Sequence, residues 1–219
     1  MNIFRFTGDM LHLASSSLLI YKLLKTKNCA GISAKMQEIY LIVFSTRYLD
    51  LFYVYFSLYN TIMKFFFIFS TIYILYLIRF QKPISKSYDK QADNFNYLIL
   101  LILPILFISY IFGQPKSIVK VLWRFSIWLE SFALVPQIVL LQKYGVVENL
   151  TSHYVTTMGL YRTFYLINWI YRLLKENYCN YTGWIGGMIQ VALYLDFFYY
   201  YFQARLNGWK MILPYANRI

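Results

Sequence analysis

The sequence predicts an all-α polytopic membrane protein with seven transmembrane helices in a single domain, residues 1–219. Hydrophobic residues make up 59% of the 219 residues, aromatic residues 21% and charged residues only 14%. Together with a mean hydropathy of +0.47, this composition is typical of membrane proteins and excludes an ordinary soluble domain. The apolar residues fall into runs of about 20, the length that crosses a bilayer, and the basic residues lie mostly between those runs.

The first expected span, 4–24, begins close to the N-terminus and has no small-residue cleavage site behind a basic leader. We therefore expect it to be retained rather than removed as a signal peptide. The other spans are expected at 36–55, 57–79, 96–113, 117–141, 152–173 and 184–205. The connections are short except for the polar segment 81–95, and residues 206–219 form a short tail. Pro104 and Pro136 fall inside spans, where neighbouring groups satisfy the carbonyls that a proline frees.

The distribution of basic residues predicts the orientation of the spans. One set of connections carries most of them: Lys25, Lys27, Lys35, Arg79, Lys82, Lys86, Lys90, Lys143, Arg205, Lys210 and Arg218. The other set carries little beyond Lys116 and Lys175. Because basic loops stay in the cytosol, we expect the N-terminus outside or in an organelle lumen and the C-terminus in the cytosol. The net charge of +12 belongs to these loops, so we expect a lipid bilayer rather than nucleic acid as the partner.

An internal repeat is predicted by a shift of 118 residues along the chain. The shift pairs His12 with Glu130, Leu24 with Gln142, Lys25 with Lys143, Ile32-Ser33 with Leu150-Thr151, Arg47 with Tyr165, and Asp50 with Asn168. These polar coincidences predict two three-helix units, spans 1–3 and spans 5–7, joined by the fourth span. An odd linker helix leaves both units in the same membrane orientation, the parallel repeat of small sugar transporters.

Polar residues recur at helical spacing on one face of four spans. The stripes are Arg5, Asp9, His12 and Ser16; Val43, Arg47, Asp50 and Val54; Lys120, Trp123, Ile127 and Glu130; and Tyr161, Tyr165, Asn168 and Arg172 with Trp169 beside them. The seventh span adds Asp196. A charge in the bilayer core costs roughly 2.5–3.5 kcal/mol on insertion scales, so such residues face the bundle interior or a water-filled cavity.

The expected orientation places these stripes in one lumen-facing cavity. Arg5, Arg47, Arg172 and His12 would converge there, and an excess of guanidinium groups in a partly dehydrated cavity favours an anion. A purely structural explanation stays open: Arg47 and Asp50 as an ion pair, His12 as a satisfied interior histidine, and Arg5 and Arg172 as interface anchors.

Several stretches of the chain resemble the KDEL receptors, which retain lumenal proteins of the endoplasmic reticulum. They are MNIFRFTGDMLHL at the start, CAGISAKMQ at 29–37, RYLDLF at 47–52, SLYNTIMK at 57–64, FSIWLES at 125–131, TSHY at 151–154, YRTFYLINWIYR at 161–172 and YLDFFYYY at 194–201. The pair Pro136-Gln137 fits the wider PQ-loop and sugar-transporter-like fold. The resemblance covers nearly the whole chain.

The resemblance implies a pH-dependent sorting receptor in endoplasmic reticulum and Golgi membranes. Such a receptor binds the C-terminal acidic tetrapeptide of escaped lumenal chaperones in the Golgi and returns them to the endoplasmic reticulum. It implies these ligand-binding residues: Arg5, Arg47, Asp50, Trp123, Tyr165, Asn168, Trp169 and Arg172. It implies His12 as the pH sensor, with Glu130 and Tyr161 as its hydrogen-bonding partners. Asp9 and Asp196 are expected to support the site, Asp196 beside the arginine of the sixth span.

Two departures from the family pattern bear on specificity and sorting. Lys120 stands where relatives often carry an acidic residue, so we expect a small neutral first residue in the tetrapeptide, with Lys120 itself lining the site. The tail RLNGWKMILPYANRI retains only Arg205 and Lys210 of the family's basic cluster, and Ile212 replaces a serine that some relatives phosphorylate. Recruitment of a retrograde vesicle coat through this tail is therefore less well supported than peptide binding.

The remaining signals are weak. Cys29 and Cys179 form no disulfide framework, no Cys/His cluster has metal spacing and no nucleophile–base set stands out, so we expect no enzyme, cofactor or metal. Asn180 begins a glycosylation sequon on the expected lumenal side. The alternative function is a small-solute or proton-coupled amino-acid transporter of the PQ-loop or sugar-transporter type. A neutral sugar, however, needs amides and aromatic rings rather than three arginines.

Overall fold

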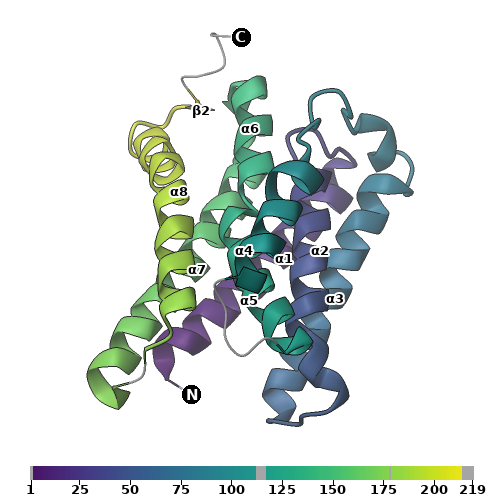
Figure 1. Cartoon of the computed structure of the whole chain (residues 1–219). Coiled ribbons are helices and arrows are strands. Elements are labelled where there is room, and N and C mark those ends of the chain that lie inside the picture. Colours follow the sequence, from purple (N-terminus) through teal and green to yellow (C-terminus); the bar gives the residue numbers. More distant parts are fainter. Residues whose placement is uncertain (1, 112–116, 178, 214–219) are drawn as a thin grey trace.

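The computed structural model of the chain describes residues 2–111, 117–177 and 179–213, and within them it is a bundle of seven helical rods. The N-terminal residues and the short strand β2 lie at opposite ends of the bundle (Figure 1). The elements are α1 (Ile3–Thr26), α2 (Ala34–Arg47), α3 (Leu58–Arg79), α4 (Leu103–Ile111), α5 (Ile118–Phe132), α6 (Val135–Tyr144), α7 (Asn149–Glu176) and α8 (Tyr181–Leu206), with strands β1 (Val146–Val147) and β2 (Met211–Ile212).

Short irregular helices complete the rods. A 3-10 helix, Tyr48–Phe52, continues α2, and a π-helical turn, Leu98–Ile102, leads into α4. α5 and α6 run on from each other across residues 118–144 and form one rod. Another 3-10 helix, Ile84–Ser87, lies in the polar connection between α3 and α4.

Local sequence explains where several helices begin. The side chains of Asn2, Ser33, Ser57 and Asn180 each accept a hydrogen bond from a backbone N–H in the first turn of the helix that follows. Such caps satisfy donors that have no partner within the helix. At the other end of α1, Lys27 takes the left-handed conformation that commonly ends a helix.

Two of the rods are long and apolar enough to cross a membrane by length and composition alone, Leu58–Arg79 and residues 118–144. The rods match the expected spans in order, but their limits differ. α2 ends at Arg47, eight residues before the expected end of its span, whereas α7 reaches Glu176. The long helices α1 and α7 carry ionisable residues on the faces that meet inside the bundle, which lowers their hydropathy.

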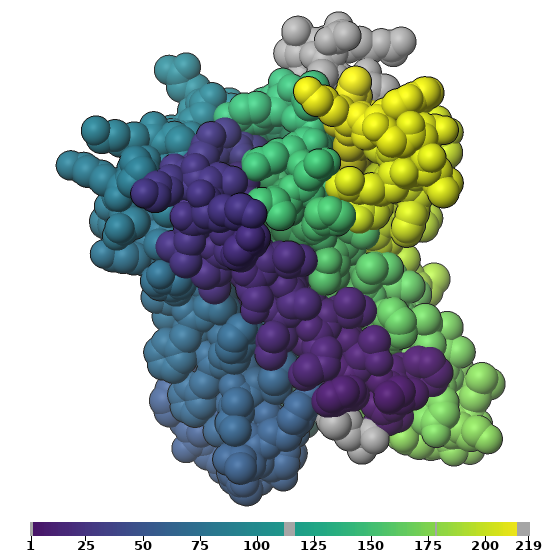
Figure 2. Space-filling model, turned by 180° about the vertical axis from the view of Figure 1, so that it is seen from behind, coloured from purple at the N-terminus to yellow at the C-terminus, as the bar shows by residue number. Residues whose placement is uncertain are grey.

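α1 and α7 form the most extensive contact between helices among the described residues. Figure 2 shows α1 running across this face of the molecule, with the end of α7 beside its N-terminal part. α3 packs against α1 and α2, α8 packs against α7 and α5, and α2 packs against α5. Gly8 permits the close approach of α1 to α7, because a Cβ there would lie 2.8 Å from the Tyr165 ring.

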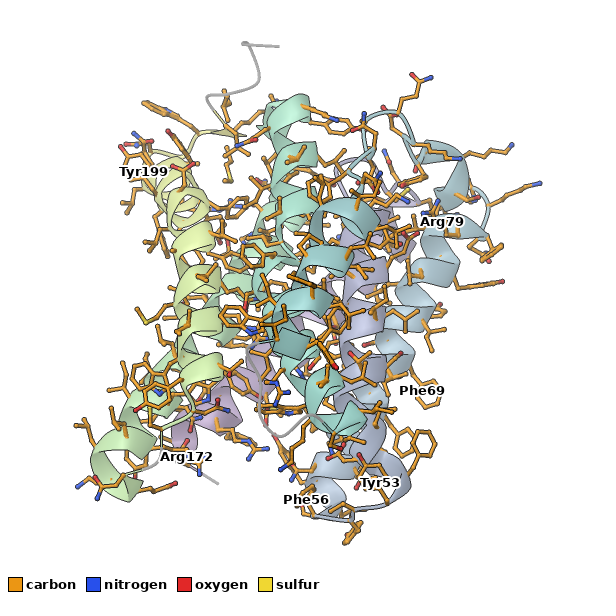
Figure 3. All side chains as sticks on the ribbon, viewed as in Figure 1. Tyr53, Phe56, Phe69, Arg79, Arg172 and Tyr199 are labelled. Atoms are coloured by element: carbon orange, nitrogen blue, oxygen red, sulfur yellow. The ribbon has the colours of Figure 1, made fainter. Side chains whose placement is uncertain are left out.

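The end of the bundle that carries β2 is closed by polar contacts. Glu38 accepts hydrogen bonds from Arg79 and, at 2.9 Å, from Tyr97, which ties α2 to α3 and to the start of the fourth rod. The Gln137 amide donates to the Gly31 carbonyl at 2.6 Å and accepts from the Ser33 N–H at 2.9 Å. Figure 3 shows Arg79 at this end of the molecule.

The connection before α7 and the segment after α8 meet in a two-stranded antiparallel sheet, in which Val146 pairs with Ile212. Beside it, Arg205 donates to Asn149 and Ser152, each at 3.3 Å. These contacts attach the first part of the predicted tail, up to residue 213, to the start of α7. The rest of the tail, 214–219, lies outside the described residues, as do Lys116 and Arg218 of the orientation argument.

Candidate functional site

Three adjoining cavities open at the end of the bundle that carries the N-terminal residues. The largest, here called the outer chamber, has a volume of about 810 Å³. Two smaller chambers lie deeper: the His12 chamber of about 180 Å³ and the Trp169 chamber of about 240 Å³. Arg47 lines all three, so its guanidinium marks the point where they meet.

Arg47 lies in the last turn of α2, and its donors are occupied in this structure. It forms an ion pair with Glu130 of α5. Its Nε donates to the Ser126 hydroxyl at 3.1 Å, and one terminal nitrogen donates to the Ser126 carbonyl at 2.9 Å. Glu130 is 2% exposed and also pairs with Arg162 of α7. One buried carboxylate therefore holds two arginines, and the trio retains a formal positive charge.

His12 lies on α1 between two aromatic rings. The imidazole stacks on Tyr161 at 4.3 Å between ring centroids and on Phe67 at 4.1 Å. Tyr161 in turn donates from its hydroxyl to Glu130 at 3.1 Å. The three residues expected to act together are thus adjacent, but His12 contacts Tyr161 by stacking rather than by the expected hydrogen bond.

Beyond His12 the interior is filled by buried tyrosines, here called the tyrosine floor: Tyr40, Tyr154, Tyr161 and Tyr194. Each is at most 2% exposed. Tyr154 accepts a hydrogen bond from Gln37 at 2.8 Å, while the hydroxyls of Tyr40 and Tyr194 have no hydrogen-bond partner among the described residues. The floor separates the His12 chamber from the end of the bundle that carries β2.

Asp9 holds the wall of the cavity where α1 crosses α7. This buried carboxylate accepts hydrogen bonds from Tyr165 of α7 and, at 2.8 Å, from Tyr59 of α3. One turn further along α7, Asn168 accepts from the Asn2 amide at 2.6 Å. Asp9 and Tyr165 both line the His12 chamber, and the supporting role of Asp9 stays a prediction.

Trp169 lies against the first turns of α8, where Gly187 makes room for its ring. A Cβ at Gly187 would come within 2.5 Å of the indole, whereas one at Gly183 would lie at an ordinary contact distance of 3.4 Å. Arg172 lines the same chamber and is paired with Glu176 at 2.7 Å. Figure 3 shows Arg172 at the open end of the bundle.

Asp50 and Arg47 do not form an ion pair with each other. A structural ion pair therefore does not explain why these two charges lie in an apolar span. Asp50 lies in the 3-10 helix and accepts from Lys64 of α3 at 2.6 Å. Its other carboxylate oxygen is buried and has no hydrogen-bond partner among the described residues. An acceptor is therefore available to a donor that enters the outer chamber.

Three of the predicted site residues, Arg5, Lys120 and Trp123, line the outer chamber. Arg5 donates to the Asn60 side chain at 3.0 Å, and neither Arg5 nor Lys120 forms an ion pair within the described residues. Over the three chambers, seven basic residues stand against three carboxylates: Arg5, Arg47, Lys64, Lys120, Arg124, Arg162 and Arg172 against Asp9, Asp50 and Glu130. Such a cavity attracts anions.

Some of the predicted site residues lie outside the three chambers, and some residues that line the chambers were not predicted. Asp196 is exposed on α8, lines none of the three chambers and has no ion pair with Arg172 among the described residues. Arg205 and Lys210 lie at the opposite end of the bundle, and their role in sorting stays a prediction. The predicted site residues did not include three cations that line the cavity, Lys64, Arg124 and Arg162. Each is a charge inside an apolar span and was detectable as such.

Comparison with known proteins gives one consistent result. Residues 28–172 match the family described as ER lumen protein retaining receptor. The ER lumen protein-retaining receptor of Plasmodium falciparum is 54% identical over 221 aligned residues that cover both chains completely. That of Petunia hybrida is 47% identical over 98% of this chain and all of its own. The ER lumen protein-retaining receptor 2 of Bos taurus is 42% identical with the same coverage.

Proposed function

The chain belongs to the family of ER lumen protein-retaining receptors, and from this membership we propose that it binds an acidic C-terminal tetrapeptide of lumenal proteins. The receptor would capture escaped proteins in the Golgi and return them to the endoplasmic reticulum. The observation that carries the tetrapeptide proposal is the excess of basic over acidic residues in the three chambers.

The geometry favours a chain end as the ligand. A cavity that opens at one end of the bundle and stops at the tyrosine floor admits the end of a polypeptide, but not a segment that continues in both directions. We propose that Arg5, Arg47 and Arg172 bind the terminal carboxylate and the acidic side chains, because arginine binds carboxylates in bidentate geometry. The unpaired oxygen of Asp50 would accept an N–H group nearer the ligand's amino-terminal side.

Ligand binding at Arg47 requires a rearrangement of its present partners. Glu130 and Ser126 occupy the guanidinium, so an incoming carboxylate must share it with Glu130 or displace that carboxylate. A proton taken up by His12 would offset the added negative charge, and Tyr161 connects the two groups. By linkage, an anionic ligand that favours the protonated state binds more tightly as the pH falls.

The membrane arrangement is part of the proposal. We propose that the seven rods span the bilayer of the endoplasmic reticulum and Golgi as one domain, 1–219, with the N-terminus in the lumen and residues 206–219 in the cytosol. The packing supports a repeat of two three-helix units: α3 contacts α1 and α2, as α8 contacts α5 and α7. In this repeat α1, α2 and α3 correspond to α5, α7 and α8. The contact of α1 with α7 then corresponds to the contact of α5 with α2, and these two contacts join the units. Coat recruitment through Arg205 and Lys210 remains a proposal.

Binding of a labelled tetrapeptide to the purified receptor at pH 5.5 and pH 7.4 tests the proposed function. We expect saturable binding that is tighter at pH 5.5 and is weakened when the peptide C-terminus is amidated. The receptor reconstituted in liposomes should transport neither the peptide nor sugars or amino acids. Flux without saturable peptide binding would support a transporter instead.

Replacement of a cavity arginine by alanine distinguishes binding in the cavity from a general effect of positive charge on the receptor. Arg47→Ala should lose binding at both pH values, because the ligand carboxylate would be desolvated without its partner, at a cost of roughly 2–5 kcal/mol. Arg79→Ala is the matched control, since Arg79 lies at the opposite end of the bundle. Unchanged affinity in Arg47→Ala would contradict the site.

A further inference from the structure

The outer chamber is the passage through which any bound chain end must leave the receptor. The His12 chamber shares Arg5, Arg47 and Lys64 with it, and the Trp169 chamber shares Arg47, Trp123 and Asn180. If the last four residues of a protein occupy the deeper chambers, the residues before them lie in the outer chamber. That chamber therefore contacts a part of the ligand that the tetrapeptide proposal does not include.

The lining of the outer chamber is strongly basic. Five of its residues are cationic: Arg5, Arg47, Lys64, Lys120 and Arg124. Asp50, the one carboxylate among its described residues, is already engaged by Lys64 at 2.6 Å. Lys120 and Arg124 lie one turn apart on α5, and Arg124 also contacts α4 through a 3.3 Å hydrogen bond from its Nε to the Ser109 carbonyl. Among the described lining residues, cations therefore outnumber carboxylates five to one, although Arg47 is paired with Glu130 in the neighbouring chambers and Lys64 with Asp50.

Aromatic side chains also line the outer chamber, and two of them contact Lys64. Tyr53 and Phe56 line the outer chamber, and Figure 3 shows them close together at the open end of the bundle. The Lys64 ammonium lies over the Phe56 and Tyr48 rings, at 5.5 Å and 5.6 Å from their centroids. A cleft with charge of one sign and low-dielectric walls focuses its field and raises the local concentration of the opposite charge.

We infer that the outer chamber is a second recognition site, which binds acidic residues immediately preceding the C-terminal tetrapeptide. The inference rests on the proposed function, because it requires the chain end to occupy the deeper chambers. It places Lys120 where the first residue of the tetrapeptide meets the residues before it, so the receptor selects lumenal proteins by more than their last four residues.

Two eight-residue peptides that end in the same four residues, Ser-Asp-Glu-Leu, provide the test. One carries four glutamates before these residues and the other carries four glutamines. For exposed ion pairs we expect the acidic peptide to bind about threefold to tenfold more tightly at low ionic strength. The difference should shrink as salt is added, because screening weakens exposed pairs.

Receptor variants locate the effect. Lys120→Gln should reduce the ratio of the two affinities by about half or more. Lys175→Gln is the matched control, because Lys175 is exposed in the last turn of α7, at the open end of the bundle, but lines none of the chambers. In this variant the ratio of the two affinities should stay unchanged. Thermal unfolding in detergent verifies that both variants are folded. If Lys120→Gln is not folded, Lys120→Arg should preserve the ratio, and the salt dependence in the wild type decides.

The outcomes separate this inference from the proposed function. Equal affinities of the two peptides for the wild-type receptor at low salt would overturn the inference and leave tetrapeptide binding intact. An equal reduction of the ratio in the two variants would also overturn it, because the effect would then come from the general charge of this end of the molecule. Absence of binding by either peptide would contradict the proposed function itself.

Discussion

At the scale of single residues, the charge of the cavity depends on which carboxylates pair with which basic residues. Glu130 holds Arg47 and Arg162, and the stack of His12 on Tyr161 brings a titratable ring next to that trio. Addition of a proton to His12 places a further positive charge in this group. That charge is unfavourable beside two arginines and becomes acceptable once an anion enters.

We therefore expect His12→Ala to flatten the pH dependence of peptide binding. Histidine ordinarily titrates at a pKa of about 6.5, and one proton limits the gain to tenfold per pH unit, about 1.4 kcal/mol. Affinities measured between pH 5.5 and 7.4 give the slope. His153→Ala is the control, since His153 lies at the start of α7, where it contacts Tyr201 and Arg205. An unaltered slope in His12→Ala would assign the sensor to another group.

Lys120 should determine the preferred first residue of the tetrapeptide. It lines the outer chamber without an ion pair among the described residues, so a cationic first residue meets a like charge. We expect Ser-Asp-Glu-Leu to bind the wild type more tightly than Lys-Asp-Glu-Leu, and Lys120→Glu to reverse or abolish the preference. The size of this preference depends on the local dielectric constant. Competition between the two peptides measures it, and a ratio untouched by the substitution would rule out the charge effect.

At the scale of elements, sequence patterns located the rods better than their ends. The stripes on α1, α5 and α7 could be predicted because ionisable residues at helical spacing rarely face lipid. The stripe of the second span is interrupted, because α2 ends at Arg47 and Asp50 lies in the 3-10 helix that follows. The end of α2 could not be predicted, because residues 48–56 are mostly apolar and contain neither glycine nor proline. There the chain turns into a 3-10 helix whose Asp50 contacts Lys64, a tertiary contact between residues 14 positions apart. For the same reason the pairing of Arg47 with Glu130 was not predictable from spacing.

The crossing of α1 and α7 is the contact between elements that positions the site. We expect Gly8→Ala to destabilise the receptor by about 1–3 kcal/mol, because its methyl group would press on the Tyr165 ring. Peptide affinity should fall as well, since Tyr165 would lose its contact with Asp9. Thermal unfolding in detergent measures the first effect. Gly183→Ala is the control, because its Cβ would lie at an ordinary contact distance of 3.4 Å.

At the scale of the whole molecule, the two cysteines report the proposed orientation. Cys179 is exposed at the open end of the cavity, whereas Cys29 is 1% exposed in the connection between α1 and α2. Burial raises the pKa of the Cys29 thiol, which further reduces its reactive thiolate. A membrane-impermeant maleimide should therefore label the receptor in sealed Golgi vesicles only after the membrane is permeabilised.

Labelling should disappear in Cys179→Ser and persist in Cys29→Ser. Labelling of sealed vesicles that requires Cys179 would place the cavity in the cytosol and reverse the proposed topology.

The fold class and the shared face of the polar stripes were predictable, but the floor of the cavity was not. Its tyrosines lie on three different helices and meet only in the folded bundle.

The tyrosine floor has a consequence for the membrane as a barrier. A receptor that presents a water-accessible cavity to an acidic compartment would dissipate the proton gradient if the cavity ran through to the cytosol. Tyr40, Tyr154, Tyr161 and Tyr194 fill that route with rings that are at most 2% exposed. Replacement of Tyr194 by alanine would leave a void beneath the binding site, and liposomes containing that variant should leak protons faster than those with the wild type. In these terms the floor is an insulator, which lets the organelle keep the pH difference that the receptor senses.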